Sequence, residues 1–415
     1  MVRVFGGIWL GVLALGAAWP AVGGEWTVLA YLSGDGSLEP VALDYARRLS
    51  LTPGTEHVSV AIQIDRGPGF ESEAGHFEDT RRAVLVGTTG QTPRPWRWSD
   101  WRAEVNMGDP GTLVEFLAWG ARAAPAKRYV VLLVGHGSGV RPFVEEAQRT
   151  DHGVAYDATS AGDSLTPGEF GVVGPAIIEA LGGRRVALLA VDACFSASAE
   201  MAAEAAEFAD VMTGSPNLLY EPGVPWDVVL QGLCQSPGAS AEQIAGLAVE
   251  AAGATQALNG QAHGSYAAAR LDGVGTLETR LEALSGALCG RMPEAAPAVT
   301  AARARSSRGG LSEEMLDLRG FLRALRDEAA RGGLGDIEAH TTAAGEALDA
   351  MVLASCAGTA VEAGGEGWTW SVFCPPNLTE FPADYMRTGR FARESGWGSF
   401  LEAYLGHLQR LMWGA

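Results

Sequence analysis

The stretch VALLAVDACFSAS at residues 186–198 places two reactive side chains at the end of an apolar run. Residues 186–191 are all apolar, and a short continuous run of this kind is typical of a buried strand in a parallel sheet. Reactive groups and ligand sites in such sheets lie just beyond the carboxyl ends of the strands. Asp192 and Cys194 therefore occupy the place where a functional carboxylate and thiol are expected. An inert core cysteine would more naturally lie inside the run.

Three earlier runs are also predicted to be buried strands: WTVLAYL at 26–32, VSVAIQID at 58–65 and YVVLLVG at 129–135. Helical sequence separates these runs. One predicted helix has Asp109 as its N-cap and Pro110 in its first turn. Because the strands alternate with helices, we expect an α/β fold with a mostly parallel central sheet covered by helices on both faces.

The sequence changes character after about residue 235, and 415 residues are enough for two domains. Leucine and methionine spacing predicts an amphipathic helix over 311–325, and GWTWSVFCPP at 367–376 reads as a strand that stops at the prolines. We therefore predict a C-terminal α+β region at 235–415. Within it, residues 290–310 are rich in Ala, Pro, Arg and Ser and are expected to form a mobile surface segment.

The first 24 residues have the pattern of a secretory signal peptide, with Arg3, an apolar region over 4–18 and small residues before Glu25. We expect a secreted or periplasmic protein with no stable membrane span after signal removal. The net charge of −19 argues against nucleic acid and anionic membrane partners. It would suit a cationic ligand, although acidity that only keeps the protein soluble explains the charge equally well.

The sequence contains five cysteines, so at least one thiol cannot form a disulfide within the chain. They are Cys194, Cys234, Cys289, Cys356 and Cys374. If Cys194 is the free one, the other four are expected to be disulfide-linked, or at least unreactive, in an oxidising compartment. Neither a CxxC pair nor histidines at zinc-ligand spacing occur in the sequence, which argues against a structural zinc site.

His136 follows the run at 129–135 much as Cys194 follows the run at 186–191. On neighbouring parallel strands the two side chains would meet at one edge of the sheet, where the imidazole organises proton transfer and the thiolate attacks a carbonyl. The N–H groups of Gly137 and Cys194 could form an oxyanion hole, and a helix beginning after Cys194 would favour the thiolate. Taken singly, such residues are more often an inert thiol and an ordinary histidine. Their matched placement favours the functional pair.

Asp192 lies two residues before Cys194, so strand alternation points both side chains the same way. A carboxylate beside a nucleophilic cysteine disfavours the negatively charged thiolate, so the presence of Asp192 requires an explanation. One reason is the binding of a positively charged substrate side chain. The alternative is an N-cap for the following helix.

With HGSG after one strand and DAC after the next, the sequence resembles the clostripain-like cysteine peptidases, relatives of caspases, gingipains and legumains. The resemblance extends over about residues 26–406, through segments in the family's order: WTVLAYLSGDGSLE, IQIDR, VNMGDPGTLVEFLAWG, YDATSAGDSLTPGEF, GSPNLLYEPGVPW, MLDLRGFLRAL and MRTGRFARESGWGSFLEAYL. Departures occur at Gly135, Val140 and Pro216, where an aspartate, a tryptophan and an acidic residue are common, and these bear on the shape of the substrate pocket.

The resemblance implies a caspase-like α/β/α sandwich, with a catalytic domain at 25–234 and the region at 235–415 completing the fold. It also implies a His136–Cys194 dyad that cleaves polypeptides after Arg or Lys through a thioester, with Asp192 lining the pocket for the basic side chain. A catalytically inactive homologue that binds basic peptides is the main alternative. A serine esterase is a weaker one, because no G-x-S-x-G elbow occurs in the sequence.

Two further expectations come from the same resemblance. No cofactor is required, but some family members use Ca2+, and DATSAGD offers Asp157 and Asp163 as oxygen ligands. Family members are commonly activated by cutting a loop after the catalytic histidine. Arg149, in the polar stretch VRPFVEEAQRTDHG, is therefore the expected site of self-cleavage, and a surface loop that is never cut is the alternative.

Overall fold

The computed structural model of the chain describes residues 23–68, 77–85, 93–140, 143–145, 148–150, 153–261, 264–306, 314–357, 368–378 and 385–413. Of the predicted signal peptide, residues 1–22 lie outside this described part. Residue 24, the last of that predicted segment, is already the first residue of strand β1.

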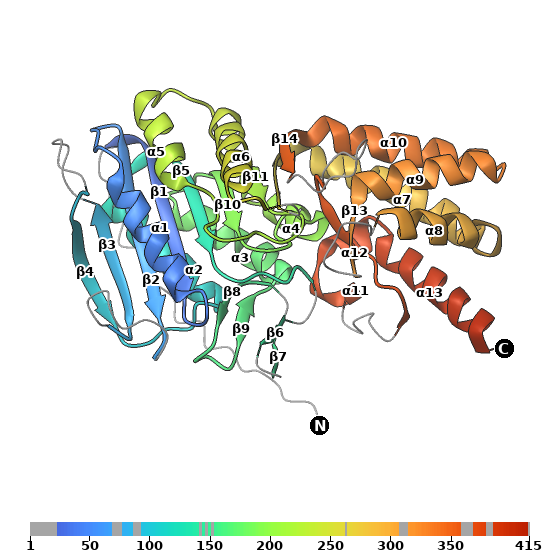
Figure 1. Cartoon of the computed structure of the whole chain (residues 1–415), viewed down its shortest axis with the longest axis horizontal. Coiled ribbons are helices and arrows are strands. Elements are labelled where there is room, and N and C mark those ends of the chain that lie inside the picture. Colours follow the sequence, from blue (N-terminus) through green and yellow to red (C-terminus); the bar gives the residue numbers. More distant parts are fainter. Residues whose placement is uncertain are drawn as a thin grey trace.

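A nine-stranded sheet runs through the described part of the chain in the order β14-β12-β11-β10-β5-β1-β2-β3-β4 (Figure 1). Its strands are β1 (Gly24–Gly34), β2 (Val58–Arg66), β3 (Thr80–Leu85), β4 (Trp96–Arg102), β5 (Ala126–Val134), β10 (Val186–Asp192), β11 (Ala209–Gly214), β12 (Ser265–Arg270) and β14 (Val352–Ala357). The five central strands β2, β1, β5, β10 and β11 are parallel, and antiparallel pairs flank them at both edges. The four strands predicted from the sequence are confirmed as members of the parallel centre.

Helices cover both faces of this sheet, so the central strands are buried on both sides (Figure 1). One face carries α1 (Glu39–Leu51), α5 (Trp226–Gln235) and α6 (Ala241–Leu258), and the other carries α2 (Pro110–Ala123), α3 (Pro167–Ala180) and α4 (Ala199–Ala205). The Asp109 carboxylate caps α2 as predicted, because it accepts hydrogen bonds from the N–H groups of Gly111 and Thr112. The predicted α/β class with helices on both faces is confirmed.

Most of the remaining helices gather beyond the β14 edge of the sheet, at the C-terminal end of the molecule (Figure 1). They are η1 (Leu271–Gly273), α7 (Val274–Gly290), α8 (Met292–Ser306), α9 (Leu318–Arg331), α10 (Gly335–Met351), α11 (Tyr385–Thr388), α12 (Arg390–Glu394) and α13 (Trp397–Trp413). Small two-stranded sheets are formed by β6 (Phe143–Glu145) with β7 (Gln148–Thr150), β8 (Val154–Asp157) with β9 (Asp163–Leu165), and β13 (Met315–Asp317) with β15 (Ser371–Phe373). Because β12 and β14 join the central sheet, that sheet continues past residue 234, the boundary predicted from the sequence.

Two expectations for the C-terminal region are wrong. Met315, assigned by its spacing to an amphipathic helix, lies in β13 opposite Phe373, and α9 begins only at Leu318. Residues 292–306, expected to be a mobile surface segment, form α8 and bury Ala295, Val299 and Ala302. Alanine is the strongest helix former, and its small side chain packs closely, so a composition that suggested a loop forms a buried helix face instead.

Within the described residues, no helix is both long enough and apolar enough to cross a membrane.

Candidate active site

His136 and Cys194 lie beyond the carboxyl ends of two adjacent parallel strands, as predicted. In the β5–β10 pair Val134 is opposite Asp192, so each reactive residue follows this pair by two positions. The segments that carry them are in contact: a Cβ atom built on Gly137 would lie 2.3 Å from the carbonyl oxygen of Cys194 and 3.1 Å from its nitrogen. The structure therefore brings the predicted histidine and cysteine segments together at one sheet edge.

The His136 ring is held by two residues that sequence reasoning did not single out. Its Nε2 is 2.8 Å from Oγ of Ser37, which lies between β1 and α1. The ring of Tyr156 in β8 meets it edge-on, with 6.1 Å between ring centroids. Ser37 is 99 positions away in the sequence, and no local pattern connects it with the histidine.

The Cys194 sulfur is half-buried and contacts the backbone that follows β11. The N–H of Leu219 donates to Sγ at 3.3 Å, and the carbonyl oxygen of the same residue is 3.8 Å away. Burial and the charge of Cys194 together raise the pKa of the neighbouring Tyr220 hydroxyl.

The predicted helix does not begin at Cys194. Phe195 has a φ of +53°, the chain turns, and α4 starts at Ala199 with Ser198 as its N-cap. The helix is seven residues long, and its first turn lies away from the thiol in sequence. Helix-forming composition located α4 correctly, but the turn made by Phe195 could not be read from it. The local donor to the sulfur is Leu219 instead.

Gly137 is suited to the predicted oxyanion role for two reasons. It forms an isolated antiparallel bridge with Val154, flanked by hydrogen bonds from Ala155 N to His136 O (3.2 Å) and from Ser138 N to Gly153 O (2.9 Å). At this position of a bridge the N–H points away from the partner strand. The close approach to the Cys194 backbone also leaves no room for a side chain.

Asp192 points to the opposite side of the sheet from α4 and is not its N-cap. It is 3% exposed, and both its oxygens accept hydrogen bonds from aromatic side chains. The donors are Tyr45 of α1 and Trp226 of α5 to Oδ2 (2.9 and 2.8 Å) and Tyr266 of β12 to Oδ1 (2.5 Å). Burial raises the pKa of Asp192 to about 6, and the three donors oppose this rise because they favour the charged form. We call Asp192 and these donors the aromatic cage.

Comparison with known proteins finds relatives for part of this chain. Residues 98–285 match the sequence model of the clostripain family, and this segment contains His136, Gly137, Asp192 and Cys194. Over this segment the chain is similar to the clostripain family. It is 24% identical to clostripain of Hathewaya histolytica over 236 residues, which cover 52% of this chain and 43% of clostripain. The match thus spans less than half the length of that relative.

Solved structures show the same fold as this chain. A secreted C11 cysteine protease of Bacteroides thetaiotaomicron, solved with an irreversible peptide inhibitor, is 16% identical, with a TM-score of 0.63 over 91% of this chain and 100% of that structure. An inactive zymogen C11 protease of Parabacteroides distasonis is 14% identical, with a TM-score of 0.61 over 90% of this chain and 99% of that structure. The predicted caspase-like architecture is therefore confirmed.

Arg149 lies in a short hairpin of this chain. It belongs to β7 and pairs with Val144 of β6. The polar stretch was expected to be a loop, whereas its described residues, 143–145 and 148–150, form two paired strands. Arg141, the other basic residue of the stretch, lies outside the described residues.

All five cysteines of the chain lie in its described part, and all are free, so the expected disulfides are absent from this structure. They are distributed over separate elements, with Cys234 in α5, Cys289 in α7 and Cys356 in β14. Burial raises the pKa of each of these thiols, to about 11 for Cys356, and that of Cys374 to about 12. A high pKa disfavours the thiolate, so the four are expected to be unreactive without being linked.

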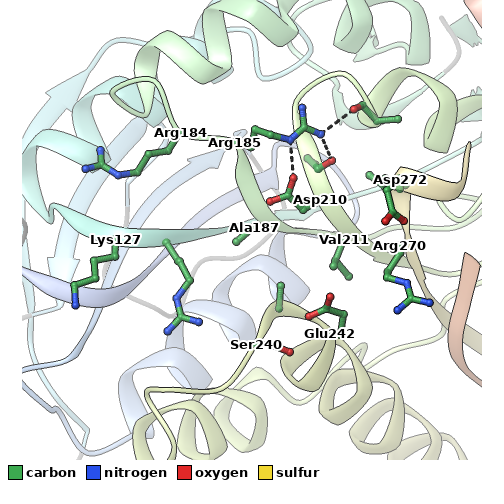
Figure 2. Close-up of a pocket in the computed structure, with 15 residues that line it drawn as sticks. Lys127, Arg184, Arg185, Ala187, Asp210, Val211, Ser240, Glu242, Arg270 and Asp272 are labelled. Carbon is green, nitrogen blue, oxygen red and sulfur yellow. Dashed lines mark hydrogen bonds and ion pairs between the residues drawn. The ribbon is translucent and has the colours of Figure 1, made fainter. Parts of the chain in front are cut away.

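The opposite end of the sheet has a cavity of about 800 Å³ with a different character (Figure 2). It is lined by the beginnings of strands, including Lys127 of β5, Arg185 just before β10 and Asp210 of β11. Arg185 pairs with Asp210 at 2.6 Å, and Lys127 pairs with Glu25 at the same distance. With neither a thiol nor an imidazole in its lining, the cavity offers no nucleophile of the predicted kind.

Proposed function

We propose that the chain is an exported cysteine endopeptidase that cleaves polypeptides after Arg or Lys, using Cys194 as nucleophile and His136 as acid and base. The observation that carries the proposal is the meeting of the two segments at the carboxyl ends of β5 and β10. The match of residues 98–285 to the clostripain family model supports the same chemistry.

The proposed mechanism gives each group a role. Sγ of Cys194 attacks the scissile carbonyl carbon while the thiol proton passes to His136. The Leu219 N–H at 3.3 Å favours negative charge on the sulfur. Since Nε2 is hydrogen-bonded to Ser37, we assign the proton transfer to Nδ1. The N–H groups of Gly137 and Cys194 would face the developing oxyanion.

The second half of the reaction uses the same groups. The imidazolium of His136 gives its proton to the leaving amine, the C–N bond breaks, and the acyl group stays on Cys194 as a thioester. Water then attacks the thioester with His136 as base, which releases the carboxylic acid and restores the thiol.

Asp192 is the proposed source of preference for a basic side chain. Its Oδ1 accepts a single protein hydrogen bond, from Tyr266, and a carboxylate oxygen can accept a second. The aromatic cage fixes the carboxylate, and the net charge of −19 favours a cationic substrate.

The test is cleavage profiling of a peptide library with the wild type and Cys194→Ala in parallel. We expect cuts after Arg and Lys by the wild type alone. Absence of cleavage by both proteins, together with retention of basic peptides, would favour the inactive peptide-binding homologue. An arginyl acyloxymethyl ketone separates the two further, because only a competent nucleophile is labelled.

We also propose self-cleavage after Arg149. The support is its position between the two proposed catalytic segments, in a two-stranded hairpin separate from the central sheet. N-terminal sequencing of the purified protein should find a new terminus at Thr150 that is absent from Cys194→Ala. An intact, fully active chain would show that the hairpin does not gate the site.

A further inference from the structure

A buried serine holds the turn that carries Cys194. Ser196 lies two positions after Cys194 and is 1% exposed. Its Oγ is 2.7 Å from the carbonyl oxygen of Val191 and 2.8 Å from that of Ala193, so its single hydrogen can be shared between the two. The N–H of Ser215, which follows β11, donates to the same Oγ at 3.0 Å. One hydroxyl therefore joins the end of β10 to the segment after β11.

The contact with Ala193 bears directly on the active site. The carbonyl group of Ala193 and the N–H group of Cys194 belong to the same peptide unit. Because a trans peptide unit is planar, its carbonyl and N–H groups point in opposite directions. A hydrogen bond that fixes the Ala193 carbonyl on Ser196 therefore also fixes the direction of the Cys194 N–H, which is one of the two proposed oxyanion donors.

The other proposed donor, Gly137, lies against the same peptide unit. A Cβ atom built on Gly137 would be 2.8 Å from Cβ of Ala193 and 3.1 Å from the nitrogen of Cys194. Two donors stabilise an oxyanion together only if both point at the place where its charge develops. A rotation of the Ala193–Cys194 peptide unit would turn one N–H away from the other, so the orientation of this unit matters for catalysis.

The turn itself adopts an unfavourable backbone conformation. Phe195 has a φ of +53°, in the left-handed region that residues other than glycine seldom adopt. Such a conformation persists only where its surroundings hold it, and it is common at functional sites. Here the N–H of Phe195 donates to Asn217 O at 2.8 Å, and that of Ala197 donates to Ser215 O at 3.0 Å. The hydroxyl of Ser196 lies between these two backbone bonds in sequence and supports the same turn.

The neighbouring strand leaves room for this hydroxyl and for little else. A Cβ atom built on Gly214, the last residue of β11, would lie 2.5 Å from Ser196 Oγ. A side chain at position 214 would therefore push the hydroxyl out of its place. The glycine and the serine thus form a matched pair, in which the absence of one side chain allows the other to reach the backbone carbonyls.

We propose that Ser196 is a positioning residue of the oxyanion hole: its hydroxyl orients the Ala193–Cys194 peptide unit so that the N–H groups of Cys194 and Gly137 face the same oxyanion. Ser196 acts through the backbone and does not contact the substrate. The inference rests on the proposed function, because an oxyanion forms only when the thiolate attacks a carbonyl. Ser196 should therefore affect kcat rather than KM.

The test compares two reactions of the same sulfur in Ser196→Ala. Peptide cleavage passes through an oxyanion, whereas alkylation of Cys194 by a small neutral reagent does not. We expect kcat for an Arg peptide substrate to fall roughly 10- to 100-fold, somewhat less than for complete removal of an oxyanion donor, with KM unchanged. The rate of alkylation at the same pH should change little.

Ser198→Ala is the matched control. Ser198 is also buried and lies in the same segment, but its Oγ accepts a hydrogen bond from the N–H of Met201 and caps α4. Its replacement should lower the Tm, as loss of an N-cap does, and should leave kcat close to that of the wild type. Equal losses of kcat in the two variants, or parallel losses of cleavage and alkylation in Ser196→Ala, would show a purely structural serine and would overturn the proposal.

A second variant decides the question if Ser196→Ala does not fold. Gly214→Ala keeps the hydroxyl but displaces it, so it should produce the same selective loss of kcat. A folded Gly214→Ala protein with the kcat of the wild type would contradict the proposal. A wild type that cleaves no peptide would refute the proposed function and this inference with it, whereas an active wild type and an equally active Ser196→Ala would refute the inference alone.

Discussion

The two ends of the parallel sheet differ in whether their charged side chains have ion-pair partners. At the amino ends of the strands the cavity of Figure 2 is rich in cations, and its Lys127 and Arg185 each have a carboxylate partner. At and near the carboxyl ends, four aspartates are buried without any ion-pair partner among the described residues: Asp35, Asp65, Asp157 and Asp192. Paired surface charge adds little stability and needs no further explanation. Buried carboxylates without cations are costly to maintain, and this end of the sheet also carries the thiol and the imidazole.

The largest expected effect is at the carboxyl end. Cys194→Ala and His136→Ala should each reduce kcat/KM by at least about a thousandfold, because the thioester cannot form or the proton cannot be transferred. Circular dichroism and Tm should stay close to those of the wild type, since both residues lie beyond the strand ends. Full activity in Cys194→Ala would refute the mechanism.

Asp192→Asn should lower kcat/KM for Arg and Lys substrates by about 10- to 100-fold, as expected for the loss of a buried charge-assisted contact. Alkylation of Cys194 by a small neutral reagent should change much less. Tyr266→Phe is the matched control, since it removes one donor of the aromatic cage and keeps the carboxylate. If alkylation and cleavage fall together in Asp192→Asn, the residue is structural.

A smaller effect is expected from pH. Because the pKa of Asp192 is raised to about 6, the carboxylate is charged above that pH and becomes neutral below it. Cleavage after Arg should therefore fall by about tenfold between pH 7 and pH 5 through Asp192 alone. Alkylation rates at the same pH values provide the correction for titration of the dyad. A corrected profile that is flat would show that the pocket does not depend on this charge.

The smallest effect is expected at the amino end. Lys127→Ala removes an ion pair with Glu25 whose side chains are 61% and 31% exposed, so the free energy of unfolding should fall by less than about 1 kcal/mol. Activity toward Arg substrates should be unchanged. Thermal unfolding and kcat/KM measured together check both statements. A large loss of activity would show that the two ends of the sheet are not as different as their charges indicate.

The sequence could predict those residues of the site whose positions are set by the ends of strands. His136, Cys194 and Asp192 follow apolar runs, and parallel pairing of those runs places them at one edge. The aromatic cage had no such signal, because Tyr45, Trp226 and Tyr266 lie 147, 34 and 74 positions from Asp192. Only tertiary packing of helices and of β12 brings them together.

The group formed by Asp157 and the nearby carboxylates of Asp35, Asp65 and Glu104 shows the same limit of sequence reasoning. Asp157 was suggested by a local run of oxygen-rich residues, and its neighbour Asp163 was chosen for the same reason. The partners that the structure gives it come instead from the ends of β1 and β2, which are far away in sequence. The C-terminal errors have a related cause, since Met315 pairs as a strand only because β15 is beside it.

The pairing of β5 with β10 joins strands that lie on either side of the β6–β7 hairpin in the sequence. Any cut between residues 136 and 194, Arg149 included, puts the histidine on one polypeptide and the cysteine on the other. Neither fragment could then be active alone. Activity would require the two fragments to associate through the five residue pairs between β5 and β10. Fragments 25–149 and 150–415, expressed separately and mixed, would constitute a complementation system whose activity depends on the concentration of both.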